Sequence, residues 1–266
     1  MGYNNEVTIH SKEDFEGMRK AGRFAAEVLD ALVDFIKPGI STDDINNFCH
    51  KMIVGGGAIP APLGYRGFPK SVCTSVNHVV CHGIPGPKKL KEGDIINVDV
   101  TVIIDGWHGD TSRMYWVGKK ITKKAERLTH VTYEAMMRGI ELVKPGATLG
   151  DIGHAIQSYA EGLGYSVVRD YCGHGIGRIF HTMPNVLHYG FKGSGMELKE
   201  GMFFTVEPMI NAGKEATKLS DKDGWTVTTR DRSLSAQFEH TIGVTADGHE
   251  IFTDSPTGKV CPPYRF

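Results

Sequence analysis

Residues 91–99 read Lys-Glu-Gly-Asp-Ile-Ile-Asn-Val-Asp, and residues 199–207 read Lys-Glu-Gly-Met-Phe-Phe-Thr-Val-Glu. A second phrase also occurs twice, in the same order and at nearly the same separation. Lys-Pro-Gly begins at residues 37 and 144 and is followed each time by Ser or Thr and then by Asp-Ile. Two repeats that keep their order and spacing indicate an internal duplication. The chain is therefore predicted to fold as two related halves about a pseudo-two-fold axis.

The composition is that of a globular chain. Of 266 residues, 40% are hydrophobic and 23% are charged, and the net charge of −1 provides no basic field for nucleic acid or an anionic membrane. The five cysteines include no Cys-x-x-Cys pair, which argues against a disulfide framework and a zinc ribbon. Residues 1–10 lack the apolar stretch of a secretory signal, and no apolar run reaches the length of a membrane span. We therefore expect a cytoplasmic protein without membrane contact.

Helical periodicity and capping residues predict two helix pairs, each followed by runs with strand character. The helices are expected at about 11–36, 41–53, 122–143 and 149–163, and the strands at 72–81, 94–104, 107–117, 166–171, 202–210, 225–230 and 235–245. This is an α+β plan used twice, with antiparallel strands and flanking helix pairs. We expect one domain over residues 1–266, with halves at about 11–117 and 118–251 and short tails at both ends.

Asp105-Gly106 lies between two strand-like runs and predicts a two-residue hairpin turn. With that turn Ile104 faces Trp107, and the register then places Asp99 opposite Ser112 and Thr101 opposite Asp110. Alternation of side chains puts the polar residues of the hairpin on one side of the sheet: Asn97, Asp99, Thr101, His108, Asp110 and Ser112.

Asp99 and Asp110 are diagonal neighbours in this register, with Cα atoms about 7–8 Å apart. Two carboxylates at that range can hold a metal ion, whereas without a cation each would raise the pKa of the other. The alternative is that both acids face solvent. The opposite side of the strand, from Ile96 to Ile104, is already fully apolar, so the polar stripe needs an explanation of its own.

The second half contributes two further acids. Phe203 to Glu207 is the duplicated strand, and Pro208 is expected to end its pairing. Glu239 lies in the last long strand at the place that corresponds to Asp110, although taken alone it could be an exposed edge-strand acid. The duplication favours convergence of four acids, two from each half, about the pseudo-axis.

Three histidines lie in glycine-rich phrases. His174 lies within Gly173-His174-Gly175, His181 follows shortly after it, and His82 lies in a weaker copy of the phrase. Flanking glycines let a ligand approach the backbone closely, so one histidine could complete a metal site and another could contact substrate. A loop histidine bonded to a carbonyl is the alternative for each, and for His82 a structural role is a serious rival.

Four carboxylates and one imidazole form an oxygen-rich donor set. Structural zinc sites prefer Cys and His, so such a set disfavours one. It suits Mn, Fe(II), Co(II) or Zn in a centre of two ions, because ions about 3.5–4 Å apart need bridging carboxylates.

With these five residues in this chain order, the sequence resembles the pita-bread (creatinase/aminopeptidase) metallohydrolases, and among them the type I methionine aminopeptidases. The similarity extends from about Ser11 to Ile251. Its most specific stretches are residues 65–73, 81–85, 99–111, 172–181, 204–209 and 233–241. The sequence departs from the pattern at Pro62, where relatives often have Cys, and at Phe68, where Tyr is common. In this family both positions belong to the pocket for the methionine side chain, and Pro62 and Phe68 keep that pocket apolar.

The resemblance implies roles for individual residues. Asp99 and Asp110 would bind one divalent ion and His174 and Glu207 the other, with Asp110 and Glu239 bridging the two. His82 and His181 would contact the scissile peptide. The methionine pocket would be lined by Tyr65, Phe68, Cys73, Phe180 and Trp225. A sodium or potassium ion would bind near Asn77, Val79 and Ser235.

The implied activity is hydrolytic removal of the N-terminal methionine from nascent polypeptides near the ribosome, with a small uncharged second residue preferred. Water activated by two metal ions would attack the methionyl carbonyl. Glu207 would move the proton, His181 would stabilise the oxyanion, and His82 would bond the new N-terminal side. We expect a monomer that binds no nucleic acid directly.

Two other classes are alternatives. One is a different pita-bread hydrolase, such as a prolidase, aminopeptidase P or creatinase, but these usually carry an additional N-terminal domain for which 266 residues leave no room. The other is a non-catalytic binding module on the same fold. Such modules lose metal ligands, whereas all five expected ligands are present here.

Overall fold

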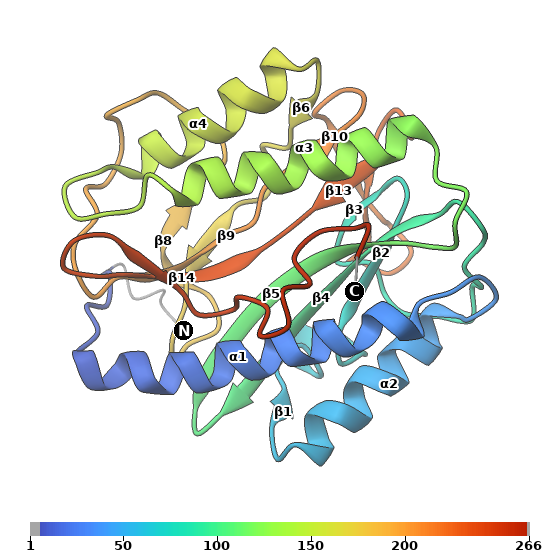
Figure 1. Cartoon of the computed structure of the whole chain (residues 1–266), viewed down its shortest axis with the longest axis horizontal. Coiled ribbons are helices and arrows are strands. Elements are labelled where there is room, and N and C mark those ends of the chain that lie inside the picture. The colour runs from blue at the N-terminus through green and yellow to red at the C-terminus, as the bar shows by residue number, and fades with distance from the viewer. Residues whose placement is uncertain (1–5, 265–266) are drawn as a thin grey trace.

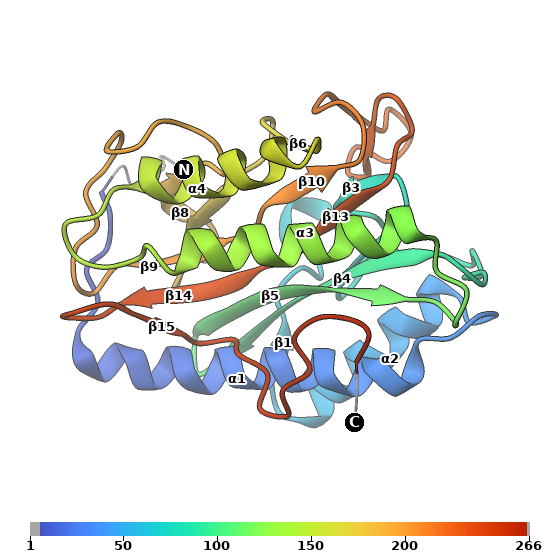
Figure 2. The ribbon, with the colours of Figure 1, turned by 45° about the horizontal axis from the view of Figure 1, so that its top comes forward.

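The computed structural model describes residues 6–264, so the ends of the predicted domain, residues 1–5 and 265–266, lie outside the description. Two helix pairs enclose the strands from opposite sides (Figures 1 and 2). The helices are α1 (Lys12–Phe35), α2 (Thr42–Gly55), α3 (Lys123–Ile140) and α4 (Leu149–Gly162). The α+β prediction, with a helix pair in each half, is confirmed.

The second repeated phrase is a helix start. Ser41 Oγ accepts from the Asp44 N–H at 3.1 Å, and the Asp44 carboxylate accepts from the Ser41 N–H at 2.7 Å. Thr148 and Asp151 make the same reciprocal pair at 3.3 and 2.8 Å before α4. Each pair satisfies two N–H groups that the first helical turn leaves without partners. The repeat therefore fixes where the second helix of each half begins.

The glycine of the first repeated phrase has the same structural role in both halves. Gly93 and Gly201 have φ of +89° and +86°, a left-handed conformation that costs glycine no steric clash with a Cβ atom. Both lie in the turn that leads into a central strand. These strands are β4 (Ile95–Ile104) in the first half and β9 (Phe203–Val206) in the second.

Strands β4 and β5 (Trp107–Trp116) form the predicted hairpin in the predicted register. Ile104 pairs with Trp107, Asp99 with Ser112 and Thr101 with Asp110. Asp105 and Gly106 have φ of +51° and +81°, as the tight turn requires. Strand β4 also pairs with β1 (Ile59–Pro60) and β2 (Cys73–Val76).

The second half is built around a five-stranded antiparallel sheet in the order β15-β14-β9-β7-β8. Its other strands are β7 (Gly173–Gly175), β8 (Thr182–Val186), β14 (His240–Val244) and β15 (His249–Ile251). Two three-stranded sheets complete the fold, β13-β10-β6 and β11-β12-β3. Their strands are β3 (Val79–Cys81), β6 (Ser166–Val167), β10 (Met209–Asn211), β11 (Thr217–Leu219), β12 (Val227–Thr229) and β13 (Ser235–Gln237).

Several predicted strands were too long, because the chain changes partners within them. The run at 72–81 divides at Asn77, which has φ of +57°. The run at 202–210 divides at Glu207-Pro208, as the proline predicted. The run at 235–245 divides at Glu239, whose N–H bonds to the Ser112 carbonyl of the first half at 3.1 Å. At each break the backbone leaves regular strand pairing.

Helix α1 packs directly on the β4–β5 hairpin. A Cβ atom at Gly109 would lie 2.4 Å from the carbonyl carbon of Ala21 in α1, so only glycine allows this approach. Val98, Val100 and Val102 of β4 are fully buried on the same side of the hairpin, and each contributes about 1.5–3 kcal/mol by leaving water. The polar side of the hairpin is consequently turned toward the second half.

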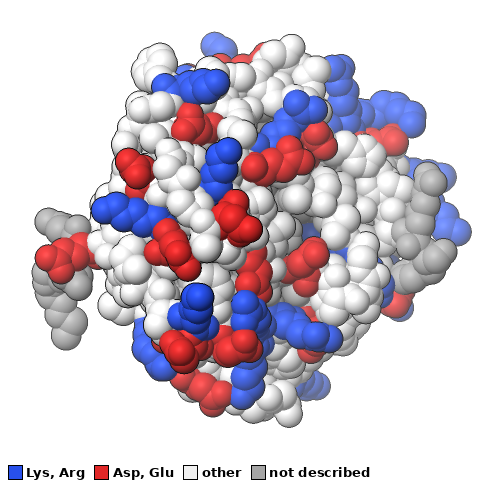
Figure 3. Space-filling model, turned by 60° about the vertical axis from the view of Figure 1, so that its left-hand side comes forward, with Lys and Arg blue, Asp and Glu red and all other residues white. Residues whose placement is uncertain are grey.

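Charged residues of both signs lie on the face of the molecule that Figure 3 shows. On the face in Figure 3, acidic and basic side chains are interspersed rather than gathered by sign. Among residues 6–264, no helix is long and apolar enough to cross a membrane.

A buried ion pair links α1 to the hairpin. Arg113 Nη1 lies 2.6 Å from Asp30 Oδ1, and their side chains are 3% and 8% exposed. We expect Arg113→Met to lower the free energy of unfolding by about 3–5 kcal/mol, because it leaves a buried carboxylate without its cation. Urea-induced unfolding would measure the change.

Arg138→Met is the matched control, since Arg138 pairs with Glu134 at the surface. Its expected cost is about 0–1 kcal/mol. Equal losses in the two variants would contradict the role given to the buried pair.

Candidate metal centre and active site

Four carboxylates from the two halves line one cavity of about 780 Å³. Asp99 and Asp110 come from the β4–β5 hairpin. Glu207 follows the last residue of β9, and Glu239 lies between β13 and β14. The structure thus brings together the four acids that the duplication predicted.

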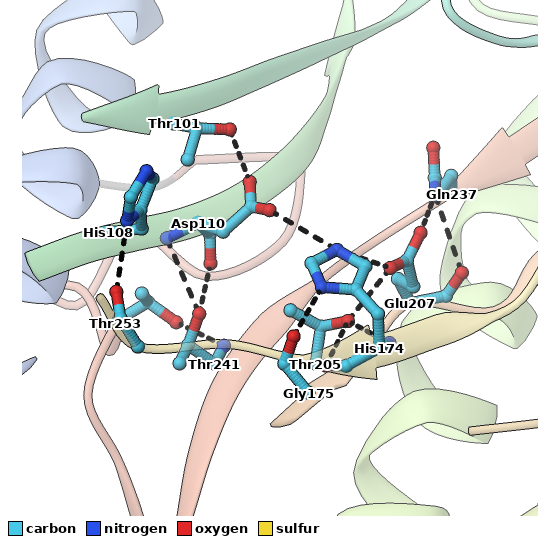
Figure 4. Close-up of polar contacts among 11 residues, drawn as sticks. Thr101, His108, Asp110, His174, Gly175, Thr205, Glu207, Gln237, Thr241 and Thr253 are labelled. Carbon is cyan, nitrogen blue, oxygen red and sulfur yellow. Dashed lines mark hydrogen bonds and ion pairs between the residues drawn. The ribbon is translucent and has the colours of Figure 1, made fainter. Parts of the chain in front are cut away.

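His174 lies between two of these acids (Figure 4). Its Nε2 is 3.6 Å from Asp110 Oδ2 and 3.7 Å from Glu207 Oε1. Its Nδ1 donates to the Gly175 carbonyl oxygen at 3.0 Å. Burial lowers the pKa of His174 to about 4, so the neutral ring has its Nε2 lone pair directed at two acids. A cation between them would remove this repulsion.

The electrostatics of the acids point to the same conclusion. Burial raises the pKa of all four carboxyl groups, and neighbouring carboxylates raise those of Asp110, Glu207 and Glu239 further. Asp99 Oδ1 is buried without a hydrogen-bond partner. Donor atoms of Asp110, His174 and Glu239 lie within 4.8 Å of one another. These residues fit divalent cations, since only positive charge would compensate the ionised acids.

Neutral side chains orient the carboxylates. Thr101 donates to Asp110 Oδ1 at 2.7 Å. Thr205 donates to Glu207 Oε1 at 2.8 Å, and Gln237 donates to Glu207 Oε2 at 3.2 Å. The hairpin register had placed Thr101 opposite Asp110. Thr205 lies two residues before Glu207 on the same side of the chain, and this spacing could have identified it. Such bonds hold ligand oxygens in fixed directions.

His188 is a further supporting residue that the sequence motifs did not reveal. It is fully buried, and its Nε2 accepts from the Glu207 N–H at 3.0 Å. Burial lowers its pKa to about 3, so the ring remains neutral and can accept this bond. Glu207 N–H thereby has a partner at the point where strand β9 ends.

Both predicted substrate-contacting histidines line the cavity. The ring of His181 lies 4.1 Å from that of His174, centroid to centroid. His82 has φ of +54° and lies against Tyr171 at 5.7 Å. Burial lowers the pKa of both rings, that of His181 to about 2. Neutral imidazoles can donate hydrogen bonds to substrate without adding charge.

The five residues predicted for the methionine pocket also line the cavity, as does Pro62. Phe68 and Trp225 meet edge to face at 5.2 Å, and Tyr65 lies 4.9 Å from Phe180. Cys73 pairs with Asp99 in the sheet. The apolar wall formed by these five predicted pocket residues therefore begins beside the carboxylates.

Two residues of the predicted monovalent-cation site lie together. The Asn77 carbonyl accepts from the Ser235 N–H at 2.8 Å. Val79 begins β3 two residues later. Ser235 Oγ is buried without a hydrogen-bond partner, which fits a nearby cation. The cation itself remains a prediction.

Comparison with known proteins connects this geometry to a family. Residues 16–246 match the description of metallopeptidase family M24. The methionine aminopeptidase of Rickettsia prowazekii is 66% identical over 258 residues, which cover 97% of this chain and 99% of that protein. The methionine aminopeptidase of Escherichia coli K12 is 56% identical over 249 residues, covering 93% and 94% of the two chains.

Solved structures agree. The crystal structure of the R. prowazekii methionine aminopeptidase has a TM-score of 0.93 and covers 94% of this chain and all of that one, at 66% identity. A prolidase from Pyrococcus furiosus has a TM-score of 0.71 at 22% identity, and the match covers 92% of this chain and 65% of the prolidase. That second likeness shows the pita-bread fold alone.

Binding of divalent ions is expected to release protons at pH 7. Raised pKa values mean that the metal-free acids hold protons near neutrality, and ions must displace them. Affinity should therefore fall as the pH is lowered. Titration calorimetry with Mn²⁺ in two buffers of different ionisation enthalpy would measure the release.

Glu239→Gln should weaken Mn²⁺ binding at least about tenfold, because it removes a donor charge. Glu134→Gln, at an exposed acid on α3, is the control and should bind normally. In the calorimetric titration of the unmodified protein, binding heats that are the same in both buffers would contradict the predicted proton release.

Proposed function

This chain belongs to metallopeptidase family M24, and from that premise we propose that it hydrolyses the peptide bond after an N-terminal methionine. One observation carries the proposal. Four buried carboxylates and an imidazole converge in a cavity that also contains two neutral histidines and an apolar aromatic wall. A non-catalytic module would not need this costly set of buried acids. The high identity to methionine aminopeptidases favours methionine over the proline-linked substrates of prolidases.

Five residues would hold two divalent ions. Asp99 and Asp110 would bind one, His174 and Glu207 the other, and Asp110 and Glu239 would bridge them. When bound, such ions would lower the pKa of water and polarise a carbonyl group. Co, Mn, Fe(II) and Zn all suit the donors. A sodium or potassium ion near Asn77, Val79 and Ser235 would stabilise the adjacent strands.

Glu207 is placed to move protons in the reaction. Thr205 and Gln237 hold its two carboxylate oxygens, and His188 holds its backbone. We propose that Glu207 accepts a proton from the attacking water and delivers it to the leaving amine. General acid–base catalysis of this kind contributes about 10²–10⁴ in rate.

The two histidines would act on the peptide itself. His181 would donate to the carbonyl oxygen as negative charge develops on it, a contribution often among the largest in acyl transfer. His82 would bond the nitrogen side of the scissile peptide. Because both rings are neutral at pH 7, each has one N–H that donates and one nitrogen that accepts. His181 can therefore donate to the carbonyl oxygen, and His82 can accept from the peptide N–H.

The cavity also sets the substrate. Tyr65, Phe68, Cys73, Phe180 and Trp225 would surround the methionine side chain, and crowding beyond the scissile bond would favour a small uncharged second residue. The natural substrates would be nascent polypeptides near the ribosome. We propose that the protein works there as a cytoplasmic monomer, without direct contact to nucleic acid.

The proposed function predicts metal-dependent release of methionine from Met-Ala-Ser. Purified protein treated with EDTA should lose the activity and regain it with Mn²⁺ or Co²⁺. N-acetylated Met-Ala-Ser should remain intact, because an aminopeptidase acts at a free α-amine, which acetylation removes. Liquid chromatography of the free methionine would measure the reaction. Preferential cleavage of a peptide with a Pro at its second position and no N-terminal Met would favour a prolidase instead.

Glu207→Gln keeps the size of the side chain but removes its basicity. We expect kcat for Met-Ala-Ser to fall about 10²–10⁴-fold, with metal content measured on the same sample. Full activity with intact metal content would exclude Glu207 as the base.

A further inference from the structure

A second cavity of about 620 Å³ lies between α4 and β8 and adjoins the candidate active site. We call it the α4–β8 groove. We propose that it binds the part of the substrate polypeptide that follows the first few residues, with apolar side chains preferred; this rests on the proposed function. The lining residues that carry the argument are Met183, Asn185, Leu187, Tyr189, Phe191 and Met196.

The groove is continuous with the active site through strand β8. Met183 and Asn185 line both cavities. Asn185 pairs in the sheet with His174, so the groove begins one strand away from the candidate metal centre. Strand β8 is also the edge of its sheet, and Asn185 is exposed there. A polypeptide that leaves the active site past His181 therefore meets the groove next.

The same strand gives the groove its direction. Met183, Asn185 and Leu187 are partly or fully exposed, whereas Pro184, Val186 and His188 are buried. The three side chains therefore lie on the same side of the chain and line the groove in chain order, beginning nearest His181. The pairing of β8 with β7 shifts between Thr182 and Asn185, so this row is not a regular strand throughout.

The chemistry of the groove fits an apolar segment. Phe191 is 81% exposed, and Leu187 and Met196 are 40% and 36% exposed. Clustered exposed apolar side chains mark sites of interaction. The exposed amide of Asn185 can bond a peptide backbone at the near end.

Charge adds a second element of selectivity. Arg169 is the one charged residue among those that line the groove in the described part of the chain. Its guanidinium lies 5.1 Å from the centre of the Tyr189 ring, a typical cation–π distance. Its Nη2 also lies 3.9 Å from Glu161 Oε1. The other described residues that line the groove are neutral, so the groove presents a guanidinium and no carboxylate to Lys or Arg in the bound segment.

Peptide kinetics with the metal-loaded protein test the groove. Three substrates share the same start: Met-Ala-Ser amide, Met-Ala-Ser-Leu-Phe-Leu-Gly amide and Met-Ala-Ser-Ser-Ser-Ser-Gly amide. We expect kcat/KM for the apolar heptapeptide to exceed that of the serine heptapeptide about five- to tenfold, mainly through KM. Equal values for the two heptapeptides would overturn the proposal. Failure to cleave even the tripeptide would overturn the proposed function instead.

Two variants locate the effect. Leu187→Asp and Phe191→Ser should reduce the preference for the apolar heptapeptide to less than about twofold, because they remove apolar surface from the groove. Leu142→Asp is the matched control, since Leu142 is also 40% exposed and lies outside the groove. It should keep the full preference. A preference that survives in both groove variants, or is lost equally in the control, would overturn the assignment.

Discussion

The mutual repulsion of buried carboxylates is the constraint on which this structure depends. Asp99, Asp110, Glu207 and Glu239 share one cavity, and burial makes each ionised group costly. The His174 lone pair adds to the negative potential rather than relieving it. Such a cluster is compatible with a folded state at neutral pH when the acids hold protons or divalent cations. Thr101, Thr205 and Gln237 hold carboxylate oxygens of Asp110 and Glu207 in fixed directions, which favours the binding of divalent cations over protonation.

The duplicated fold supplies acids to one place without a long loop. Each half begins its second helix with the same capping pair and enters a central strand through a left-handed glycine. The halves then meet where the Glu239 N–H bonds to Ser112. Their chemistry differs, however. Asp99 ends its phrase within a continuous strand, whereas Glu207 lies at a strand end and is held by three neighbours, a suitable place for a residue that also moves protons.

The hairpin and the donor cluster could be predicted because their signals are local or repeated. Asp105-Gly106 fixed the register of Asp99 and Asp110, and the repeats linked Glu207 to Asp99. The aromatic pocket came only from the resemblance to a family, whereas for His82 the glycine-containing phrase suggested contact with substrate but left a structural role open. The strand end at Pro208 was predictable from the proline itself. The breaks at Asn77 and Glu239 were harder, because there the chain changes partners through contacts distant in sequence. His188 lacked any local signal, since its bond to Glu207 arises only from tertiary packing.

The central claim is that the two halves jointly bind a pair of divalent ions. Anomalous diffraction from crystals grown with Mn²⁺ tests it most directly. We expect two peaks about 3.5–4 Å apart, with Asp110 and Glu239 between them, Asp99 beside one peak and His174 beside the other. Peaks only at the protein surface, or no peak within reach of these residues, would contradict the account.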